Sequence, residues 1–246
     1  MDTLGIDISV VPERTVACQI QWSNGRALVE APIRPVDDDR LAELLVRRAP
    51  CGIDVPLGWP IPFVDALVAH QAFQSWPARR ATVELAFRAT DRWIAQETRR
   101  TPLSVSTDRI GRTALRVAKV MSEISADWPR TYRAGTVGGV VEVYPAAALA
   151  RWGTRRYRYK SRARGATDLA AATTEFLTRP WLEFENEDCR ELYTKDEDNF
   201  DAFIASLVAR AHANGHCEPI PSEFEQAAGV EGWIALPRRG TLDALA

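Results

Sequence analysis

The stretch CGIDVPLGWP, residues 51–60, places one carboxylate inside an apolar run and repeats a pattern from the start of the chain. Gly52-Ile53-Asp54 has the same three residues as Gly5-Ile6-Asp7. Both triplets stand in short apolar runs of the kind that form buried strands. An aspartate placed twice where such a strand ends indicates a functional position on both strands.

The sequence around the two triplets predicts a mixed α/β sheet. Asn24-Gly25 is a strong hairpin signal, so the first three strands are expected to be antiparallel neighbours. Residues 37–48 read as a helix, with Asp37 or Asp38 as its cap. A strand that follows such a crossover helix is expected to pair in parallel with the first strand. Five strands are predicted, at residues 3–10, 14–22, 26–33, 51–55 and 138–145.

The rest of the chain reads as mainly helical. Residues 61–130 are expected to form a helical insertion between the fourth and fifth strands, within a single domain that spans 1–246. Pro145 is well placed in the first turn of a further helix. Helical spacing is found at residues 62–76, 82–100, 108–124, 146–152, 167–178 and 197–213, and a last short strand is expected at 232–237.

Composition favours a protein of the cytoplasm. The chain has 246 residues, of which 46% are hydrophobic, enough for a sizeable core. No apolar run approaches the ~18 residues of a membrane span, and the N-terminus lacks the basic segment of a signal peptide. Four cysteines, which we expect to be reduced, lack the spacing of metal ligands: Cys18, Cys51, Cys189 and Cys217.

Several carboxylates are expected to converge at one edge of this sheet. Sites in such folds form at the carboxyl ends of the strands, so Asp7 and Asp54 should face one crevice. Glu142 stands near the end of the fifth strand, and Asp198 and Asp201 lie three apart on one helix face. Crowded carboxylates need a counter-charge, and ligand sets of oxygen alone favour Mg²⁺ or Mn²⁺. Two such ions ~3.5–4 Å apart can clamp a phosphodiester.

Each of these acids also has a structural interpretation. Asp7 can be a turn residue, and Asp54 can cap the turn that follows it. Glu142 alternates with valines and can face solvent. Asp198 suits the N-terminus of a helix because of the helix dipole, whereas Asp201 lies one turn further in and is harder to explain as a cap.

A basic run between residues 151 and 164 is the other chemical signal. RWGTRRYRYKSRAR holds seven basic residues, three aromatic residues and no acid. A solvated surface is the usual explanation for such a run. Alternatively, Trp152, Tyr157 and Tyr159 stack on bases while the arginines bind phosphates.

The order of several motifs resembles the family called domain of unknown function 429, whose members are described as predicted RNase H-like nucleases. The motifs are GID, GIDVPLGWP, FRATDR, VEVYPAAALARWG, RYK, DNFDAFIASLVA and EGWIALP, and they cover nearly the whole chain. The resemblance implies a three-layer RNase H-like fold with strand order 3-2-1-4-5. It also implies an acidic cluster on strands one and four and on the last helix, where Asp7, Asp54 and Asp201 fall as metal ligands.

The same resemblance suggests roles for further residues. DNFDA is similar to the C-terminal acidic helix of Holliday-junction resolvases, which adds Asp198 to the expected catalytic residues. Glu142 falls in the EVYP motif as a supporting catalytic residue. Arg88 and Arg92 in FRATDR, and Lys160 in RYK, are expected to bind substrate phosphate.

The expected function is metal-dependent cleavage of phosphodiester bonds in nucleic acid, with Mg²⁺ or Mn²⁺ as cofactor. The alternatives are a small-molecule phosphohydrolase and a non-catalytic module that binds nucleic acid or protein. Actin-like kinases also open on this strand pattern, but they carry glycine-rich phosphate loops that this chain lacks. No motif supports a nucleophile triad. The helical insertion is a candidate lid, substrate clamp or homodimer surface.

Overall fold

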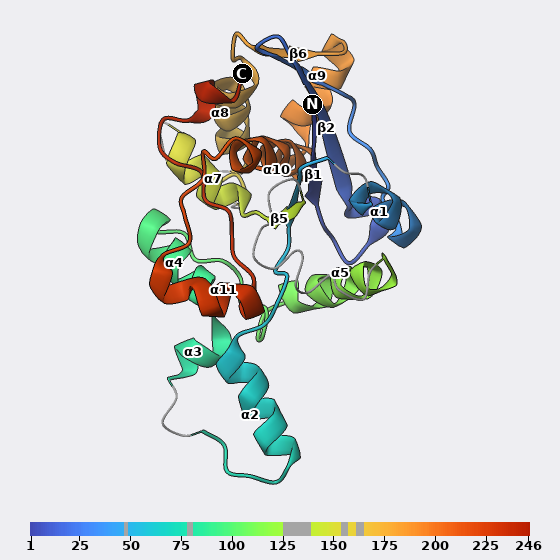
Figure 1. Ribbon diagram of the computed structural model, residues 1–246. Helices are drawn as coiled ribbons and strands as arrows, with labels where there is room; N and C mark the ends of the chain where they lie inside the picture. The colour runs from blue at the N-terminus through green and yellow to red at the C-terminus, as the bar shows by residue number, and fades with distance from the viewer. Residues whose placement is uncertain (47–48, 78–80, 125–138, 154–156, 161–164) are drawn as a thin grey trace.

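The computed structural model describes residues 1–46, 49–77, 81–124, 139–153, 157–160 and 165–246. These residues form one six-stranded mixed sheet with the order β5-β4-β1-β2-β3-β6 (Figure 1). The strands are β1 (Asp2–Asp7), β2 (Val16–Ser23), β3 (Arg26–Val29), β4 (Cys51–Asp54), β5 (Val140–Glu142) and β6 (Leu182–Phe184).

The sheet has six strands, one more than the five that the sequence predicted for it. The five predicted strands follow one another as 3-2-1-4-5, but β6 extends the sheet beyond β3 and pairs with it in parallel. The predicted strand count and the predicted complete order were therefore wrong. β6 has only three residues, too few to display the alternation that identifies a strand in sequence.

Local sequence signals determine the central pairing. Asn24 and Gly25 have φ values of 50° and 73°, as a two-residue hairpin turn with the twist of its strands requires, and they join β2 to β3. β1 is antiparallel to β2 and parallel to β4, as predicted. The crossover between β1 and β4 contains α1 (Asp38–Leu45), which begins where the Asp37 side chain accepts a hydrogen bond from the Arg40 amide.

Helices cover both faces of the sheet. α10 (Glu197–Ala213) packs across one face, where α7 (Pro145–Trp152) and α8 (Gly165–Leu177) share its hydrophobic core. The opposite face is covered by α1 and by α5 (Ile110–Ile124), which form a second core with β1 and β4. The remaining α-helices in the described residues are α2 (Ile61–Gln71), α3 (Thr82–Ala86), α4 (Ala89–Thr98), α9 (Glu187–Lys195) and α11 (Glu225–Glu231).

Between β4 and β5 the chain forms the helices α2 to α5. The single helix predicted at residues 82–100 was wrong, because Phe87 is extended (φ −121°, ψ 134°) and separates α3 from α4. A new helix begins after Arg88, whose amide donates to the Asp91 carboxylate. α2 and α3 project away from the rest of the chain, whereas α4 lies against α11 (Figure 1).

Two other predictions are resolved by the fold. The strand expected at 232–237 is reduced to isolated bridges, one of them between Ile234 and Glu142. The four cysteines are free and buried, and burial raises the pKa of Cys18, Cys51 and Cys217 to about 12. No helix among the described residues is both long and apolar enough to cross a membrane.

Candidate metal centre

The two Gly-Ile-Asp triplets lie side by side on neighbouring parallel strands. The register of β1 and β4 pairs Gly5 with Gly52 and Asp7 with Asp54. Because successive residues of a strand point to opposite faces, both glycines and both aspartates lie on the same face of the sheet. That face is the one that α10 covers.

The glycines allow α10 to lie directly on the strands. A Cβ atom added at Gly5 would lie 2.0 Å from the Ala202 carbonyl oxygen, and one at Gly52 would lie 2.3 Å from the Ala205 carbonyl oxygen. Such distances are far below van der Waals contact, so neither position tolerates a side chain. Asp201, one residue before Ala202, is thereby brought to the strand ends and is fully buried.

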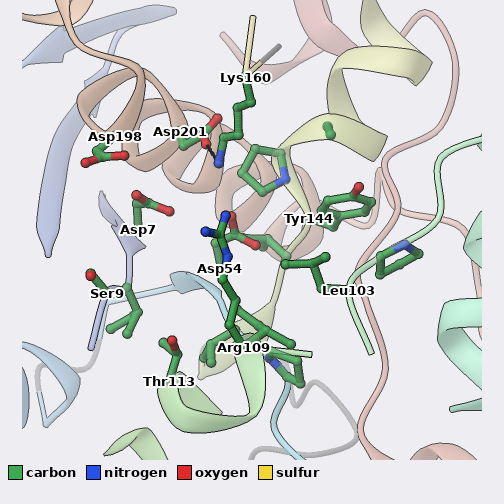
Figure 2. A pocket seen from close by; sticks show the side chains of 18 of the residues that line it. Asp7, Ser9, Asp54, Leu103, Arg109, Thr113, Tyr144, Lys160, Asp198 and Asp201 are labelled. Carbon is green, nitrogen blue, oxygen red and sulfur yellow. Dashed lines mark ion pairs between the residues drawn. The ribbon is translucent and has the colours of Figure 1, made fainter. Parts of the chain in front are cut away.

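Three carboxylates converge at this point. Asp7, Asp54 and Asp201 each offer an oxygen that lies within 4.8 Å of the others, as Figure 2 illustrates. Adjacent ligand oxygens around a six-coordinate Mg²⁺, with bonds of 2.0–2.1 Å, lie about 3 Å apart, so the three carboxylates would close by at most about 2 Å to share one ion. The carboxylates of Asp7 and Asp54 make no hydrogen bond or ion pair with the described residues, although Asp7 is only 8% exposed. The donor set therefore fits a hard divalent cation.

Crowding and burial perturb both strand-end acids. Burial raises the pKa of Asp7 well above its usual range, and the negative charge of Asp201 raises it further. Burial likewise raises the pKa of Asp54 to about 7, against the opposing positive charge of Lys160. A divalent cation stabilises the ionised form of both groups and would reverse these shifts.

A lysine already neutralises part of this cluster. The Lys160 ammonium forms an ion pair with Asp201 Oδ2, and the Tyr159 hydroxyl donates to Asp201 Oδ1. Figure 2 shows the Lys160 side chain reaching into the group of aspartates. Burial alone would lower the pKa of Lys160, but the charge of Asp201 and its neighbours raises it well above its usual range. Lys160 thus lies at the carboxylates and is a cation of the cluster itself.

Glu142 lies on the other side of the sheet from the aspartates. It pairs in register with Ile53, not with Asp54, so its side chain leaves the opposite face. Its two carboxylate oxygens accept hydrogen bonds from Arg88 at 2.6 and 2.8 Å and from the Leu57 amide at 3.0 Å. Glu142 is 2% exposed, so the interpretation as a solvent-facing strand residue was wrong.

Arg88, expected to bind substrate, is committed to the protein itself. Its guanidinium group makes five hydrogen bonds, to Asp91, Glu142 and the Glu231 carbonyl oxygen, and the residue is 1% exposed. No donor remains for a phosphate. Arg92 donates to the Phe87 carbonyl oxygen at 2.6 Å and does not line the cleft described below. Arg88 lines the cleft with its donors already engaged, and the role of the two arginines in substrate binding stays a prediction.

Asp198 lies beside the three aspartates but has its own partners. Arg14 lies 3.3 Å and Arg34 lies 3.6 Å from its carboxylate. The cap of α10 is Asp196, which accepts from the Asp198 and Asn199 amides. Asp198 adds negative charge near Asp7, and its role as a metal or catalytic residue stays a prediction.

The aromatic residues of the basic run are core residues. Trp152, Tyr157 and Tyr159 are 7%, 3% and 5% exposed and belong to the core beneath α10. The stacking of bases on these rings was therefore a wrong expectation. Arg151 forms an ion pair with Glu97 at 2.6 Å. Residues 154–156 and 161–164 of the run lie outside the described residues.

The carboxylates open into a cleft of about 1010 Å³. One of its walls is the first turn of α5, where Arg109 and Thr113 point into the cleft (Figure 2). Thr113 is 5% exposed, and its hydroxyl has no hydrogen-bond partner among the described residues. Three further side chains of this lining form no ion pair within the described part of the chain: Arg109, Arg112 and Arg158. The cleft thus combines a metal-type acid cluster with unpaired positive charge.

Sequence reasoning missed several of these features. The glycines of the triplets were not recognised as the surface on which α10 packs, although their identical spacing from the aspartates was visible. Tyr159 was assigned to stacking, and nothing local in the sequence links it to Asp201. Arg109 and Arg112 stand in an ordinary helical pattern, so only the fold places them at the cleft.

A family model described as protein of unknown function (DUF429) matches residues 5–226. The chain belongs to this family. The matched range begins at Gly5 and includes β1, β4 and α10, so all three clustered aspartates lie within it. Neither the curated proteins nor the solved structures contain a match to the chain.

Proposed function

We propose that this DUF429 protein is a divalent-metal-dependent phosphodiesterase that acts on nucleic acid. The observation that carries the proposal is the convergence of Asp7, Asp54 and Asp201 at the ends of two parallel strands. Asp7 is buried there without a partner, which is costly unless a cation binds. Buried carboxylates that lower the stability of a protein are typical of functional sites.

The proposed cofactor is Mg²⁺ or Mn²⁺, held by Asp7 and Asp54 with Asp201 as the third carboxylate. Such an ion supplies Lewis-acid activation of a phosphoryl group and of water. The chain itself positions the substrate: Arg109 and Arg112 attract its phosphates, and the Thr113 hydroxyl is available to donate a hydrogen bond. Lys160 forms an ion pair with Asp201 at the same place.

An RNase H-like core is part of the proposal. Five of the six strands follow the order 3-2-1-4-5 with β2 antiparallel to β1, which the motif resemblance implies. The acids stand on β1, β4 and α10, as the same resemblance implies. The additional edge strand β6 lies at the far side of the sheet from β4 and β5 and does not alter the acid cluster.

Nucleic acid is the proposed substrate because the cleft carries unpaired cations. Within the lining, Asp201, Glu142 and Asp198 are each paired with a basic side chain. The unpaired arginines Arg109, Arg112 and Arg158 then give the cleft an excess of positive charge once a metal neutralises Asp7 and Asp54. A polyanion gains most from such a lining, because each neutralised phosphate releases counterions.

A second copy of the chain is the proposed partner of α2. This helix buries only Ala66, and its exposed apolar side chains continue past its end to Phe73 and Trp76. The exposed apolar side chains on and beyond this helix are Val64, Leu67, Val68, Phe73 and Trp76. Because α2 carries Asp65 as its one acid and no lysine or arginine, this surface is complementary to itself and unsuited to nucleic acid.

A cytoplasmic location completes the proposal. All four cysteines are free and buried, the state that a reducing compartment preserves.

The test is cleavage of fluorescently labelled oligonucleotides by the purified chain in Mn²⁺ or Mg²⁺. Single-stranded and duplex DNA, the corresponding RNAs and a four-way junction make up the substrate panel, together with bis-p-nitrophenyl phosphate. Asp7→Asn is the inactive variant, and Asp39→Asn, an exposed aspartate of α1, is the matched control. We expect cleavage by the wild type and the control, a loss of at least about 10³-fold in Asp7→Asn, and no cleavage in EDTA.

The outcomes separate the alternatives. Cleavage of the small diester alone points to a small-molecule phosphohydrolase. Mn²⁺ binding without any cleavage, combined with oligonucleotide binding, points to a module that binds nucleic acid. Equal cleavage by Asp7→Asn and wild type contradicts the proposed site.

A further inference from the structure

Asp201 differs from the two other aspartates of the cluster in having both oxygens already engaged. Its Oδ1 accepts a hydrogen bond from the Tyr159 hydroxyl, and its Oδ2, which accepts no hydrogen bond from the described residues, is ion-paired with Lys160. Asp7 and Asp54, in contrast, form no polar contact with the described residues. The cluster therefore has two vacant carboxylates and one that is held by a cation of the chain.

The charges of the cluster match one divalent ion, not two. Three ionised aspartates carry three negative charges, and the Lys160 ammonium neutralises one of them. One divalent cation balances the remaining two. A second divalent cation would create a net positive cluster and would lie beside the ammonium group, with which it would compete for Asp201.

Lys160 reaches the cluster from a segment that the core holds in place. Tyr159 is 5% exposed, and its ring packs edge-to-face on Phe200 of α10, at a centroid distance of 5.9 Å. The adjacent Lys160 is thus anchored next to Asp201 on the same helix, while its side chain remains 53% exposed at the mouth of the cleft. Figure 2 shows the ammonium group directed at Asp201 from the side opposite α5.

From this geometry we infer that Lys160 is a built-in cation that replaces the second metal ion of a two-metal site. Asp7 and Asp54 would then hold a single Mg²⁺ or Mn²⁺, and the Lys160 ammonium would supply the remaining positive charge at Asp201. The inference rests on the proposed metal site and specifies its stoichiometry. It also revises the expectation of two ions drawn from the sequence.

The test is the number of Mn²⁺ ions bound per chain, measured by calorimetry and by electron paramagnetic resonance of free Mn²⁺. Titrations are made with and without a phosphorothioate oligonucleotide, since a second ion often needs the substrate phosphate as a ligand. The variants are Lys160→Met, which keeps the length of the side chain without its charge, and Lys160→Gln. Lys195→Met, at an exposed lysine of α9, is the matched control.

We expect one Mn²⁺ per wild-type chain in both titrations and the same value for Lys195→Met. Removal of the ammonium frees Asp201, so Lys160→Met and Lys160→Gln are expected to bind a second Mn²⁺ or to bind the first about tenfold more tightly. Circular dichroism confirms that each variant is folded before titration.

Two results would overturn the inference. Two Mn²⁺ ions bound by the wild type with oligonucleotide would mean that Lys160 leaves the cluster when metal enters. Unchanged stoichiometry and affinity in both Lys160 variants would mean that the ammonium is no part of the charge balance. The proposed function can fail independently of this inference. One bound ion without cleavage contradicts the nuclease activity but not the inference, whereas cleavage with two bound ions contradicts the inference but not the nuclease activity.

Discussion

Asp7 and Asp54 are carboxylates that the fold holds together although each raises the cost of ionising the other. Both lie next to Asp201 in a buried cluster, and the pKa of Asp54 rises to about 7 because burial outweighs the attraction of Lys160. A group whose folded-state pKa is raised makes the folded protein less stable when it ionises. At the residue scale, the site is therefore destabilising until a cation binds.

This strain leads to a prediction about stability. Asp54→Asn is expected to raise the free energy of unfolding at pH 8 in EDTA by about 1–3 kcal/mol, because asparagine is never charged. The folded-state pKa of Asp54, about 7, exceeds the usual 3.8. The stability that protonated Asp54 contributes to the wild type is therefore fully present below pH 4 and is lost as the pH rises through 7. The difference between variant and wild type should thus open between pH 4 and 7 and stay constant above.

Urea unfolding at a series of pH values measures this difference. Asp38→Asn is the control of opposite sign, because a hydrogen bond from Arg116 lowers the pKa of Asp38 and makes its ionised form stabilising. Equal effects of the two substitutions would contradict a strained site.

At the scale of elements, the contact between α10 and the sheet places the site. Gly5 and Gly52 remove two side chains from the face on which α10 lies, and small residues of the helix, Ala202 and Ala205, meet them there. The Thr3 and Ser206 hydroxyls hydrogen-bond across the same contact at 2.9 Å. The close approach of helix and strands brings Asp201 within reach of Asp7.

This packing predicts a large effect of one added methyl group. Gly52→Ala is expected to lower the free energy of unfolding by about 2–4 kcal/mol, because the new Cβ would lie 2.3 Å from the Ala205 carbonyl oxygen. Mn²⁺ affinity should fall with it, since α10 must move. Gly229→Ala, in α11, is the matched control: nothing lies within 4 Å of its added Cβ. A Gly52→Ala protein as stable as the control would contradict the close packing.

A second prediction at this scale concerns the projecting helix α2. Val68 and Phe73 are 62% and 100% exposed, and the double substitution to serine is expected to convert a dimer into a monomer in sedimentation velocity. Leu115→Ser, at an apolar residue of α5 that is 62% exposed, should leave the dimer intact. A wild-type chain that sediments as a monomer at high micromolar concentration would rule out self-association through α2.

At the scale of the whole molecule, a buried ionic network joins the helical insertion to the sheet and to the C-terminal segment. Arg88 connects Asp91 of α4 with Glu142 of β5, and the Glu231 carboxylate accepts from the Ala89 and Ile61 amides. Thr90 accepts from the Ile234 amide. The contacts of Glu231 and Ile234 join segments that are more than a hundred residues apart in the chain.

The network distinguishes a structural role of the FRATDR motif from substrate binding. Arg88→Met is expected to lower the free energy of unfolding by about 3–5 kcal/mol, because it leaves two buried carboxylates without their partner. Arg92→Met, a few residues away and partly exposed, should have a small effect on stability. Thermal unfolding and Mn²⁺ calorimetry check the pair. If the Arg88→Met protein is as stable as the wild type and has lost only oligonucleotide binding, Arg88 binds substrate and the structural role is wrong.

The central strands, the hairpin, most helices and the three clustered aspartates could be predicted from the sequence. These features depend on short-range causes: alternation and apolar runs, the Asn24-Gly25 turn, helix caps, and the parity that places Asp7 and Asp54 on one face. The motif order also identified the family, which the match over residues 5–226 confirms. The sequence did not predict the break between α3 and α4 or the edge strand β6, because each depends on a few residues with weak local signals.

Which charged residues meet depends on the tertiary fold and could not be predicted from the sequence. Glu142 and Arg88, both expected at the site, pair with each other, because Glu142 lies in register with Ile53 and points to the face opposite the aspartates. Lys160 precedes Asp201 by 41 residues in the sequence and lies at its carboxylate because Tyr159 packs against α10. Charge pairing in a folded chain follows distances across elements, and those distances depend on how closely α10 can approach the two glycines of the sheet.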